Sequence, residues 1–348
     1  MKMLKRKLII TYVFISFTLV GCAPQAQENA LDAAFASVEA LDYEAALAGF
    51  EAAAEEESNR QQAARGKGIA LLGLTRYEEA AESLIHALSY SDERLDAFDY
   101  DTNYYLATAY YKMGQYEQAE AVYSAILDLR EETDAYYLRG IVRLELADKE
   151  NAMTDFDRAL ALDDHNHDRR IDIFCAMAER GYKEEGMTYL QAALGNSDTK
   201  MSSYDKGRFS YYLEDYENAR NYLEEAKVTG EADTVLLLGK TYEKLGDYNY
   251  AASIYSNFLS DRGDDLLIYN QLGICKMSAG AYEEALQAFQ KALAMEEKQM
   301  TQTLRFNELI AYEYMGEFEQ ALILLKEYLA DYPDDREAAR EYEFLISR

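Results

Sequence analysis

The chain has 348 residues, with 35 lysines and arginines against 64 aspartates and glutamates, so its formal net charge is −29. Affinity for nucleic acid needs basic residues that displace counterions, which excludes nucleic acid as a partner of this acidic chain. The charge indicates a solvated exterior that keeps the protein soluble and favours a monomer; a second interpretation is attraction of basic partners. The only prolines are Pro24 and Pro333, so nothing between them interrupts helices.

The N-terminus has the pattern of an export signal. Four basic residues precede Leu8–Val20, an apolar run of 13 residues that is too short to span a hydrocarbon core of ~30 Å. The run ends in Leu19-Val20-Gly21-Cys22, which resembles the bacterial lipobox, where the signal is cut before a cysteine that is then lipidated. An uncleaved anchor helix is the alternative.

The lipobox resemblance implies a signal peptide at 1–21 and a lipidated Cys22 with a short linker at 22–29. Two or more acyl chains give stable anchoring where one does not. The protein is then expected at a bacterial cell membrane, lipid-anchored and facing the outside. Whether the host has one or two membranes stays open.

After the linker, one phrase returns about every 34 residues. Gly-Gln-Tyr-Glu-Gln-Ala at 114–119 is followed by Gly-Asp-Tyr-Asn-Tyr-Ala at 246–251, Gly-Ala-Tyr-Glu-Glu-Ala at 280–285 and Gly-Glu-Phe-Glu-Gln-Ala at 316–321. Looser copies stand at 41–46, 75–80, 181–186 and 214–219, and the copy at 133–166 lacks the turn tyrosine. A repeat of this length cannot bury its own apolar face, so successive copies must stack.

The repeat resembles the tetratricopeptide repeat, a helix–turn–helix of 34 residues. In the clearest copy, Leu238-Gly239 and Tyr242 fall in the first helix, Gly246-Asp247-Tyr248 at the turn, and Ala251 and Tyr255 in the second helix. The resemblance implies an all-α superhelical solenoid of about nine helix-turn-helix repeats over 30–334, with a capping helix at 335–348. Extra residues near 90–101 are interpreted as a longer loop.

In tetratricopeptide arrays the first helix of each pair lines a concave groove. Mapping the inward positions of that family onto this chain predicts a partner-binding groove made of Tyr104, Tyr111, Lys112, Tyr137, Tyr204, Arg208, Tyr211, Tyr212, Lys240, Asn270, Phe306 and Tyr314. The same mapping adds Ile141, Ile274, Met277 and Ile310. Tyrosine offers a large contact area with a hydroxyl group, which suits protein recognition. The alternative is that a chain with 31 tyrosines carries many of them on every face, without a binding role.

No pattern of catalytic residues stands out, so we expect neither an enzyme, nor a metal, nor a cofactor. The motifs of nucleophile elbows, P-loops, dinucleotide sites and zinc proteases are missing from the sequence. The pair His165 and His167 lies in an acidic stretch between repeats and is interpreted as a solvated loop. Cys175 and Cys275 are three repeats apart, too far for a disulfide, and are interpreted as buried.

The sequence therefore predicts a membrane-tethered protein-interaction scaffold of the bacterial cell envelope, which binds protein or peptide partners in its groove. A carbohydrate-binding or wall-processing envelope protein that uses the tyrosines as a sugar platform is the alternative, and a structural spacer is another. The clamp of lysine, asparagine and arginine that grips acidic chaperone tails is not matched, since Lys240, Asn270 and Arg208 lie in different copies.

Overall fold

The structure is a computed structural model that describes residues 30–91, 96–196, 201–295 and 300–347. Contacts divide the chain into two compact units, Met1–Ala147 (unit 1) and Asp148–Arg348 (unit 2). The predicted signal peptide at 1–21 and the predicted linker at 22–29, with Cys22, lie outside the described residues.

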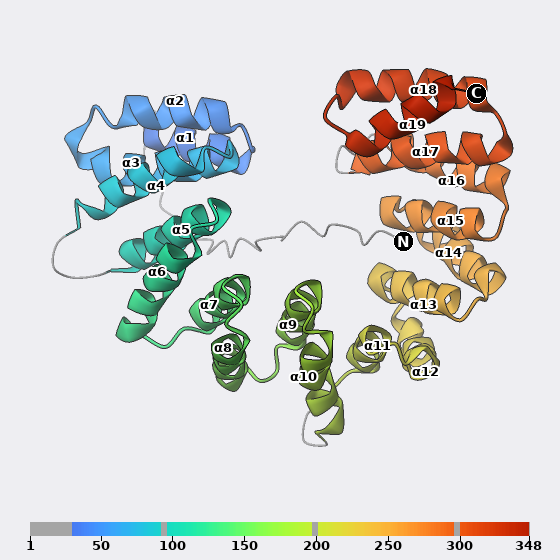
Figure 1. The fold of residues 1–348 in the computed structure, drawn as a ribbon, viewed down its shortest axis with the longest axis horizontal. Coiled ribbons are helices and arrows are strands. Elements are labelled where there is room, and N and C mark those ends of the chain that lie inside the picture. The colour runs from blue at the N-terminus through green and yellow to red at the C-terminus, as the bar shows by residue number, and fades with distance from the viewer. Residues whose placement is uncertain (1–29, 92–95, 197–200, 296–299, 348) are drawn as a thin grey trace, which may run out of the picture. The chain divides into compact units, whose positions relative to one another are not determined.

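Unit 1 is a stack of helical hairpins (Figure 1). Each hairpin packs against the next, through α2 with α3, α4 with α5, and α6 with α7. Its helices in chain order are α1 (Ala30–Glu39), α2 (Tyr43–Ala53), η1 (Glu57–Asn59), α3 (Arg60–Gly73), α4 (Tyr77–Leu88), α5 (Ala97–Lys112), α6 (Tyr116–Leu129) and α7 (Thr133–Glu145).

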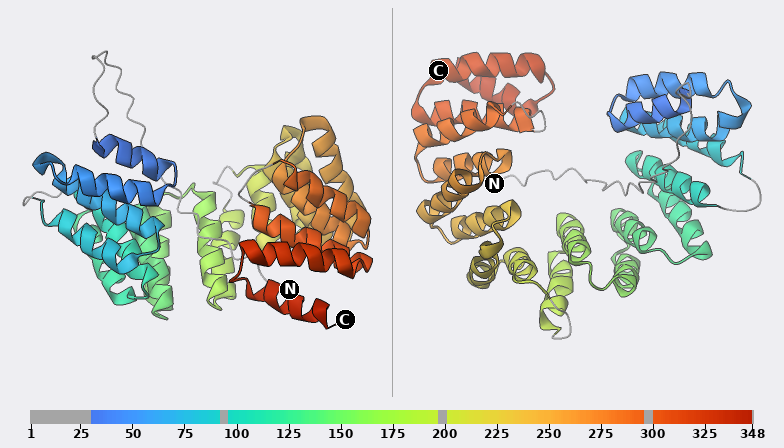
Figure 2. Two further views of the ribbon diagram at one scale, coloured as in Figure 1. Left: turned by 90° about the horizontal axis from the view of Figure 1, so that it is seen from above. Right: turned by 180° about the vertical axis from the view of Figure 1, so that it is seen from behind.

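Unit 2 continues in the same manner and ends in a single helix, α19, that packs on α18. Figure 2 shows its hairpins from two further directions. Its helices in chain order are α8 (Lys149–Leu162), α9 (His167–Glu179), α10 (Lys183–Gly195), α11 (Ser203–Tyr212), α12 (Tyr216–Ala226), η2 (Lys227–Thr229), α13 (Ala232–Lys244), α14 (Tyr248–Arg262), α15 (Leu266–Ser278), α16 (Tyr282–Leu293), α17 (Thr301–Met315), α18 (Phe318–Asp331) and α19 (Arg336–Ile346).

These helices confirm the predicted all-α fold. Over the described residues, α1 to α18 alternate as the first and second helices of nine successive pairs, and α19 follows them. The boundary between the two units falls between α7 and α8. The first helices of neighbouring hairpins also contact each other, α1 with α3 and α3 with α5 in unit 1, and α9, α11, α13, α15 and α17 in sequence in unit 2. The first helices α1, α3 and α5 of unit 1 therefore form a continuous layer, and so do α9, α11, α13, α15 and α17 of unit 2.

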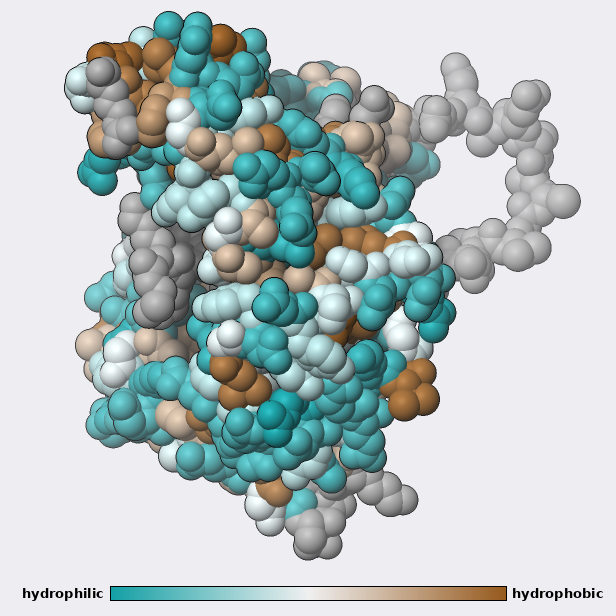
Figure 3. All heavy atoms as spheres, turned by 90° about the vertical axis from the view of Figure 1, so that its right-hand side faces the viewer, coloured by the Kyte–Doolittle hydropathy of each residue, from teal (hydrophilic) through white to brown (hydrophobic). Residues whose placement is uncertain are grey.

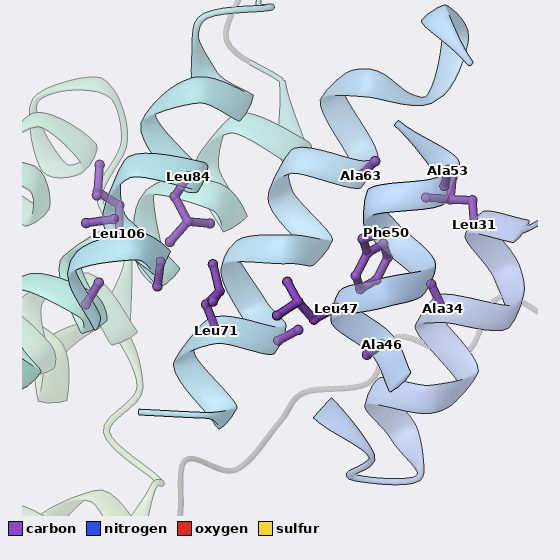
Figure 4. Packing of buried hydrophobic residues seen from close by; sticks show 14 residues of the cluster. Leu31, Ala34, Ala46, Leu47, Phe50, Ala53, Ala63, Leu71, Leu84 and Leu106 are labelled. Carbon is purple, nitrogen blue, oxygen red and sulfur yellow. The ribbon is translucent and has the colours of Figure 1, made fainter. Parts of the chain in front are cut away.

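Small residues allow the two helices of a pair to approach closely. The residue at the alanine position of the second helix is buried in every copy: Ala46, Ala80, Ala119, Ala152, Gly186, Ala219, Ala251, Ala285 and Ala321. Large side chains fill the space beside them. In unit 1, Phe50 is 1% exposed, and its ring lies against α3 at Gly66, where an added Cβ would overlap it (Figure 4). This interlocking of small and large residues lets the helices pack closely.

Every turn between a first and a second helix passes through a left-handed residue. The positive-φ residues at these turns are Leu41, Thr75, Gly114, Ala147, Gly181, Glu214, Gly246, Gly280 and Gly316. Glycine adopts this conformation without penalty, whereas a β-branched residue such as Thr75 is strained there. The copies with Leu41, Thr75, Ala147 or Glu214 at this position thus keep the same turn without a glycine.

Replacing Thr75 with glycine is therefore expected to raise the free energy of unfolding by about 0.5–1 kcal/mol. Relief of the left-handed penalty of about 1–2 kcal/mol outweighs the greater chain entropy of glycine in the unfolded state. Chemical denaturation of the two proteins measures the difference. The converse change, Gly114→Ala, adds a side chain in open space at φ +73° and should lower stability by a similar amount. Equal stabilities for wild type and Thr75→Gly would contradict the strain.

Two local predictions are corrected. The stretch interpreted as a longer loop at 90–101 is in part helix, because Asp96 caps α5 through the backbone N–H groups of Phe98 and Asp99 and so starts the helix at Ala97. The stretch with the two histidines is only partly a solvated loop. His165 is exposed, but His167 opens α9 and its ring packs edge-on against Phe209 at 5.7 Å.

Candidate protein-binding surface

All twelve residues predicted to line the groove lie on first helices. Four belong to unit 1, on α5 and α7, and eight belong to unit 2, on α11, α13, α15 and α17. Because the first helices of unit 2 contact one another in sequence, its eight residues share one layer. In Figure 1, α11 and α13 lie on the inner side of unit 2, and α12 and α14 on the outer side.

In unit 1 the predicted tyrosines are held by neighbours. The Tyr111 hydroxyl donates to Glu145 Oε1 at 2.7 Å, which joins α5 to α7, and its ring packs on Tyr116 at 5.6 Å. Tyr104 packs on Tyr123 at 6.0 Å, and burial raises the pKa of its phenol. Tyr137 is half-buried, and Lys112 is exposed.

In unit 2, Arg208 on α11 is charge-compensated. Its guanidinium donates to Asp168 Oδ1 at 2.5 Å and Asp205 Oδ1 at 3.2 Å, and it lies over the Tyr204 ring at 5.3 Å. The pair with Asp168 joins α9 to α11. Burial raises the pKa of the Tyr204 phenol. Arg208 therefore links two successive hairpins, and Tyr204 packs against its guanidinium.

Tyr211 and Tyr212 also contribute to packing. The Tyr211 ring lies 5.6 Å from Tyr216, and the Tyr212 ring lies 5.7 Å from Phe174 on α9. Both tyrosines are half-buried. Truncating them to alanine would remove core contacts together with surface, so loss of binding in such a variant would not by itself identify a binding residue.

On α13, Lys240 is half-buried. The same helix carries Glu243, whose carboxylate contacts two further helices and was not among the predicted residues. Glu243 accepts a hydrogen bond from the Tyr255 hydroxyl at 2.7 Å and from Gln271 Nε2 at 3.0 Å. It thereby joins α13 to α14 and α15. Burial raises the pKa of Glu243 and of the Tyr255 phenol. Glu243 could have been found from the sequence in one way, because it falls at an inward position of its repeat.

On α15 and α17 the predicted residues differ in exposure. Asn270 is buried and accepts a hydrogen bond from Asn307 Nδ2 at 2.9 Å, which ties α15 to α17. Phe306 packs on Tyr328 at 5.7 Å between ring centres. Tyr314, in contrast, is 61% exposed, with its ring 5.2 Å from that of Tyr282. Tyr314 is therefore well placed to contact a partner.

A cavity of about 540 Å³ lies elsewhere, in unit 1 between α2, α3 and α4. Small residues form part of its lining, including Ala54, Ala63 and Ala64, and Lys67 pairs with Glu51 across its rim at 2.9 Å. None of the predicted groove residues lines this cavity.

Other features of the described residues bear on chemistry. Between residues 30 and 347, outside the three gaps, no three His, Cys, Asp or Glu side chains form a group that could hold a metal ion.

Cys275 is buried, and burial raises the pKa of its thiol to about 12. Cys175 is only half-buried, which corrects the expectation of burial, and neither thiol is in a disulfide. Among helices α1 to α19, none is long and apolar enough to cross a membrane.

Comparison with known proteins gives the family of the repeats. A tetratricopeptide repeat family model matches residues 104–167 and 236–299, and a second such model matches 310–335. The peroxisomal targeting signal receptor of Kluyveromyces lactis is 23% identical over 210 residues, which cover 59% of this chain. The matched part spans 37% of that receptor's length.

Solved structures of tetratricopeptide repeat proteins are also similar. One from Parabacteroides merdae ATCC 43184 has a TM-score of 0.46 at 16% identity and covers 82% of this chain and 98% of that one. YrrB, described as having an unusual peptide-binding site, has a TM-score of 0.36 at 20% identity and covers 63% of this chain and 96% of that one. The family models and the nine successive helix pairs together show that this chain contains tetratricopeptide repeats and has the all-α solenoid fold that they build.

Proposed function

We propose that this protein is an interaction scaffold that binds segments of partner proteins on the first-helix layer and is held at the outer side of a bacterial membrane by a lipid on Cys22. The observation that carries the binding role is the continuous layer α9, α11, α13, α15 and α17 in unit 2, in a chain with tetratricopeptide repeats. The tether rests on the lipobox-like residues Leu19 to Cys22 alone. No chemical step is part of the proposal.

The packing of the tyrosines favours protein recognition over a sugar platform. A platform needs open ring faces, whereas the rings of Tyr111, Tyr211 and Tyr212 pack against other aromatic rings. Links such as Arg208 with Asp168 and Glu243 with Gln271 join successive hairpins and hold the layer in one arrangement before a partner arrives. Such preorganisation reduces the entropy lost on binding.

Site-specific photo-crosslinking tests the binding role. With the photoreactive amino acid p-benzoylphenylalanine at Tyr314, on first helix α17, irradiation of intact cells is expected to give protein adducts of defined mass. The matched control places it at Tyr250, which is 40% exposed on second helix α14 and should give no such adducts. Equal adduct patterns at both positions would contradict binding on the first-helix layer.

A further inference from the structure

The cavity of about 540 Å³ in unit 1, lined by α2, α3 and α4, has an apolar interior. The buried part of its lining consists of Phe50, Ala63, Ala64 and Ser83. The Ser83 hydroxyl donates to the carbonyl oxygen of Ala64 at 3.0 Å, so it is already satisfied within the protein. A face of the molecule seen in Figure 3 is, by contrast, mostly hydrophilic. The cavity therefore offers an apolar space in a hydrophilic exterior.

The cavity lies where α3 carries a small residue and two other first helices carry a tyrosine. The hairpins can be aligned at the buried small residue of each second helix, such as Ala80 of α4. In this alignment Ala64 of α3 corresponds to Tyr136 of α7 and to Tyr269 of α15. The equivalent residues of α1, α5, α9, α11, α13 and α17 are Ala30, Asn103, Arg170, Ser203, Val235 and Arg305.

The two tyrosines show how an aromatic side chain occupies this position. Tyr269 is only 8% exposed, and Lys291 Nζ of second helix α16 lies over its ring, 5.6 Å from the ring centre. Its hydroxyl donates to Asp264, in the loop before α15, at 2.7 Å. The Tyr136 hydroxyl donates in the same way to Glu131, in the loop before α7, at 3.2 Å. The position is therefore suited to a ring that lies between a first helix and its second helix.

A ring placed beside Ala64 would meet comparable neighbours. Counted from the same buried alanines, His86 takes on α4 the place that Lys291 takes on α16, and it lines the cavity. Tyr90 lines the cavity too, with its ring 4.9 Å from that of His86, and Phe50 of α2 supplies a third ring (Figure 4). Aromatic rings attract one another beyond the area that they bury. The repeats of the chain itself thus specify an aromatic side chain as the occupant.

The charges around the cavity favour a cation next to that ring. The two cations of the lining are already paired, Lys67 with Glu51 at 2.9 Å and Arg60 with Glu57 at 3.6 Å. Glu82, which also lines the cavity, is exposed and pairs with no cation among the described residues. A partner cation would gain this carboxylate, whereas a partner carboxylate would approach a chain of net charge −29.

We propose that this cavity binds an aromatic side chain of a partner protein in which the neighbouring residue is lysine or arginine. The ring fills the space beside Ala64, and the cation pairs with Glu82. None of the predicted groove residues lines the cavity, so this second interaction surface goes beyond the proposed binding on the first-helix layer and does not depend on it.

Short peptides test the inference with the full-length chain. The probe is an acetylated, amidated peptide in which lysine precedes tyrosine among glycines and serines, and broadening of its acetyl NMR signal on titration with protein measures the affinity. This peptide is expected to bind. A peptide with serine in place of tyrosine should bind at least about tenfold more weakly, because it buries no ring. A peptide with glutamate in place of lysine should bind at least about threefold more weakly, because it loses the ion pair.

A variant that fills the cavity locates the binding. Ala64→Tyr introduces the tyrosine of α7 and α15, and it is expected to abolish binding of the lysine–tyrosine peptide and to raise the urea midpoint, since cavity filling stabilises. The matched control is Ser203→Tyr, the same kind of change at the equivalent position of α11 in unit 2, which should leave peptide binding unchanged.

A charge variant supplies an independent result. Glu82→Gln should weaken the lysine–tyrosine peptide about threefold and leave a peptide with serine in place of lysine unaffected. The control Glu78→Gln, exposed on the same helix but outside the cavity lining, should change neither. Failure of the lysine–tyrosine peptide to bind, or equal binding to wild type and a folded Ala64→Tyr protein, would overturn the inference. If Ala64→Tyr does not fold, unchanged binding by Glu82→Gln overturns it.

Discussion

Replacement of Gly239 by alanine is expected to lower the free energy of unfolding by about 1–3 kcal/mol, because it overpacks a seam that cannot yield. An added Cβ on Gly239 would overlap the ring of Tyr255, which is 0% exposed. The ring cannot move aside easily, since its hydroxyl donates to Glu243 at 2.7 Å and Glu243 also accepts from Gln271. Urea denaturation followed by circular dichroism measures the effect.

A matched control separates the overlap from the general effect of glycine substitution. Gly195 ends α10 with no atom near an added Cβ, so Gly195→Ala should leave stability unchanged or raise it by up to ~1 kcal/mol. If the clash is with the ring, Gly239→Ala combined with Tyr255→Leu should cost less than the sum of the two single changes. An unchanged unfolding midpoint for Gly239→Ala would show that the packing of α13 on α14 is assigned wrongly.

Replacement of Cys22 by alanine is expected to move the protein from the membrane fraction to the soluble fraction. The proposed tether consists of acyl chains attached to this residue. Each buried CH₂ of a chain contributes about 0.8 kcal/mol, and two or more chains hold a protein stably where one does not. Fractionation, together with metabolic labelling by an alkyne fatty acid, measures attachment.

Cys175→Ala is the matched control, since this thiol is half-buried on α9 and should affect neither labelling nor fractionation. The alternative of an uncleaved anchor helix gives a different result. A wild-type protein found in the membrane at full-length mass without a lipid label would mean that Leu8–Val20 itself holds the protein, and lipidation would not be the tether.

The hairpins could be predicted because their signals are local. Seven second helices begin at the turn aromatic of the repeated phrase: Tyr43, Tyr77, Tyr116, Tyr216, Tyr248, Tyr282 and Phe318. In the two weaker copies a lysine begins the helix instead, and each lysine pairs with the following hairpin, Lys149 with Glu185 and Lys183 with Glu214. Both copies therefore keep the turn, and a lysine at the start of the second helix adds an ion pair to the next hairpin.

The surface of the first helices was predicted less well. Position in the repeat placed Tyr211 and Tyr314 in the same class, yet Tyr211 is half-buried between rings and Tyr314 is 61% exposed. The difference depends on which side chains the neighbouring hairpins supply.

The sequence by itself determined the helical hairpins, their number and the small residues between them. A close-packed helix pair tolerates large side chains at few positions, so the same pattern of small residues recurs in every copy. Only the tertiary structure decided which inward residues are exposed and that Glu243 joins three helices. Those properties depend on contacts between successive hairpins, such as that of Gln271 with Glu243, which no single repeat specifies.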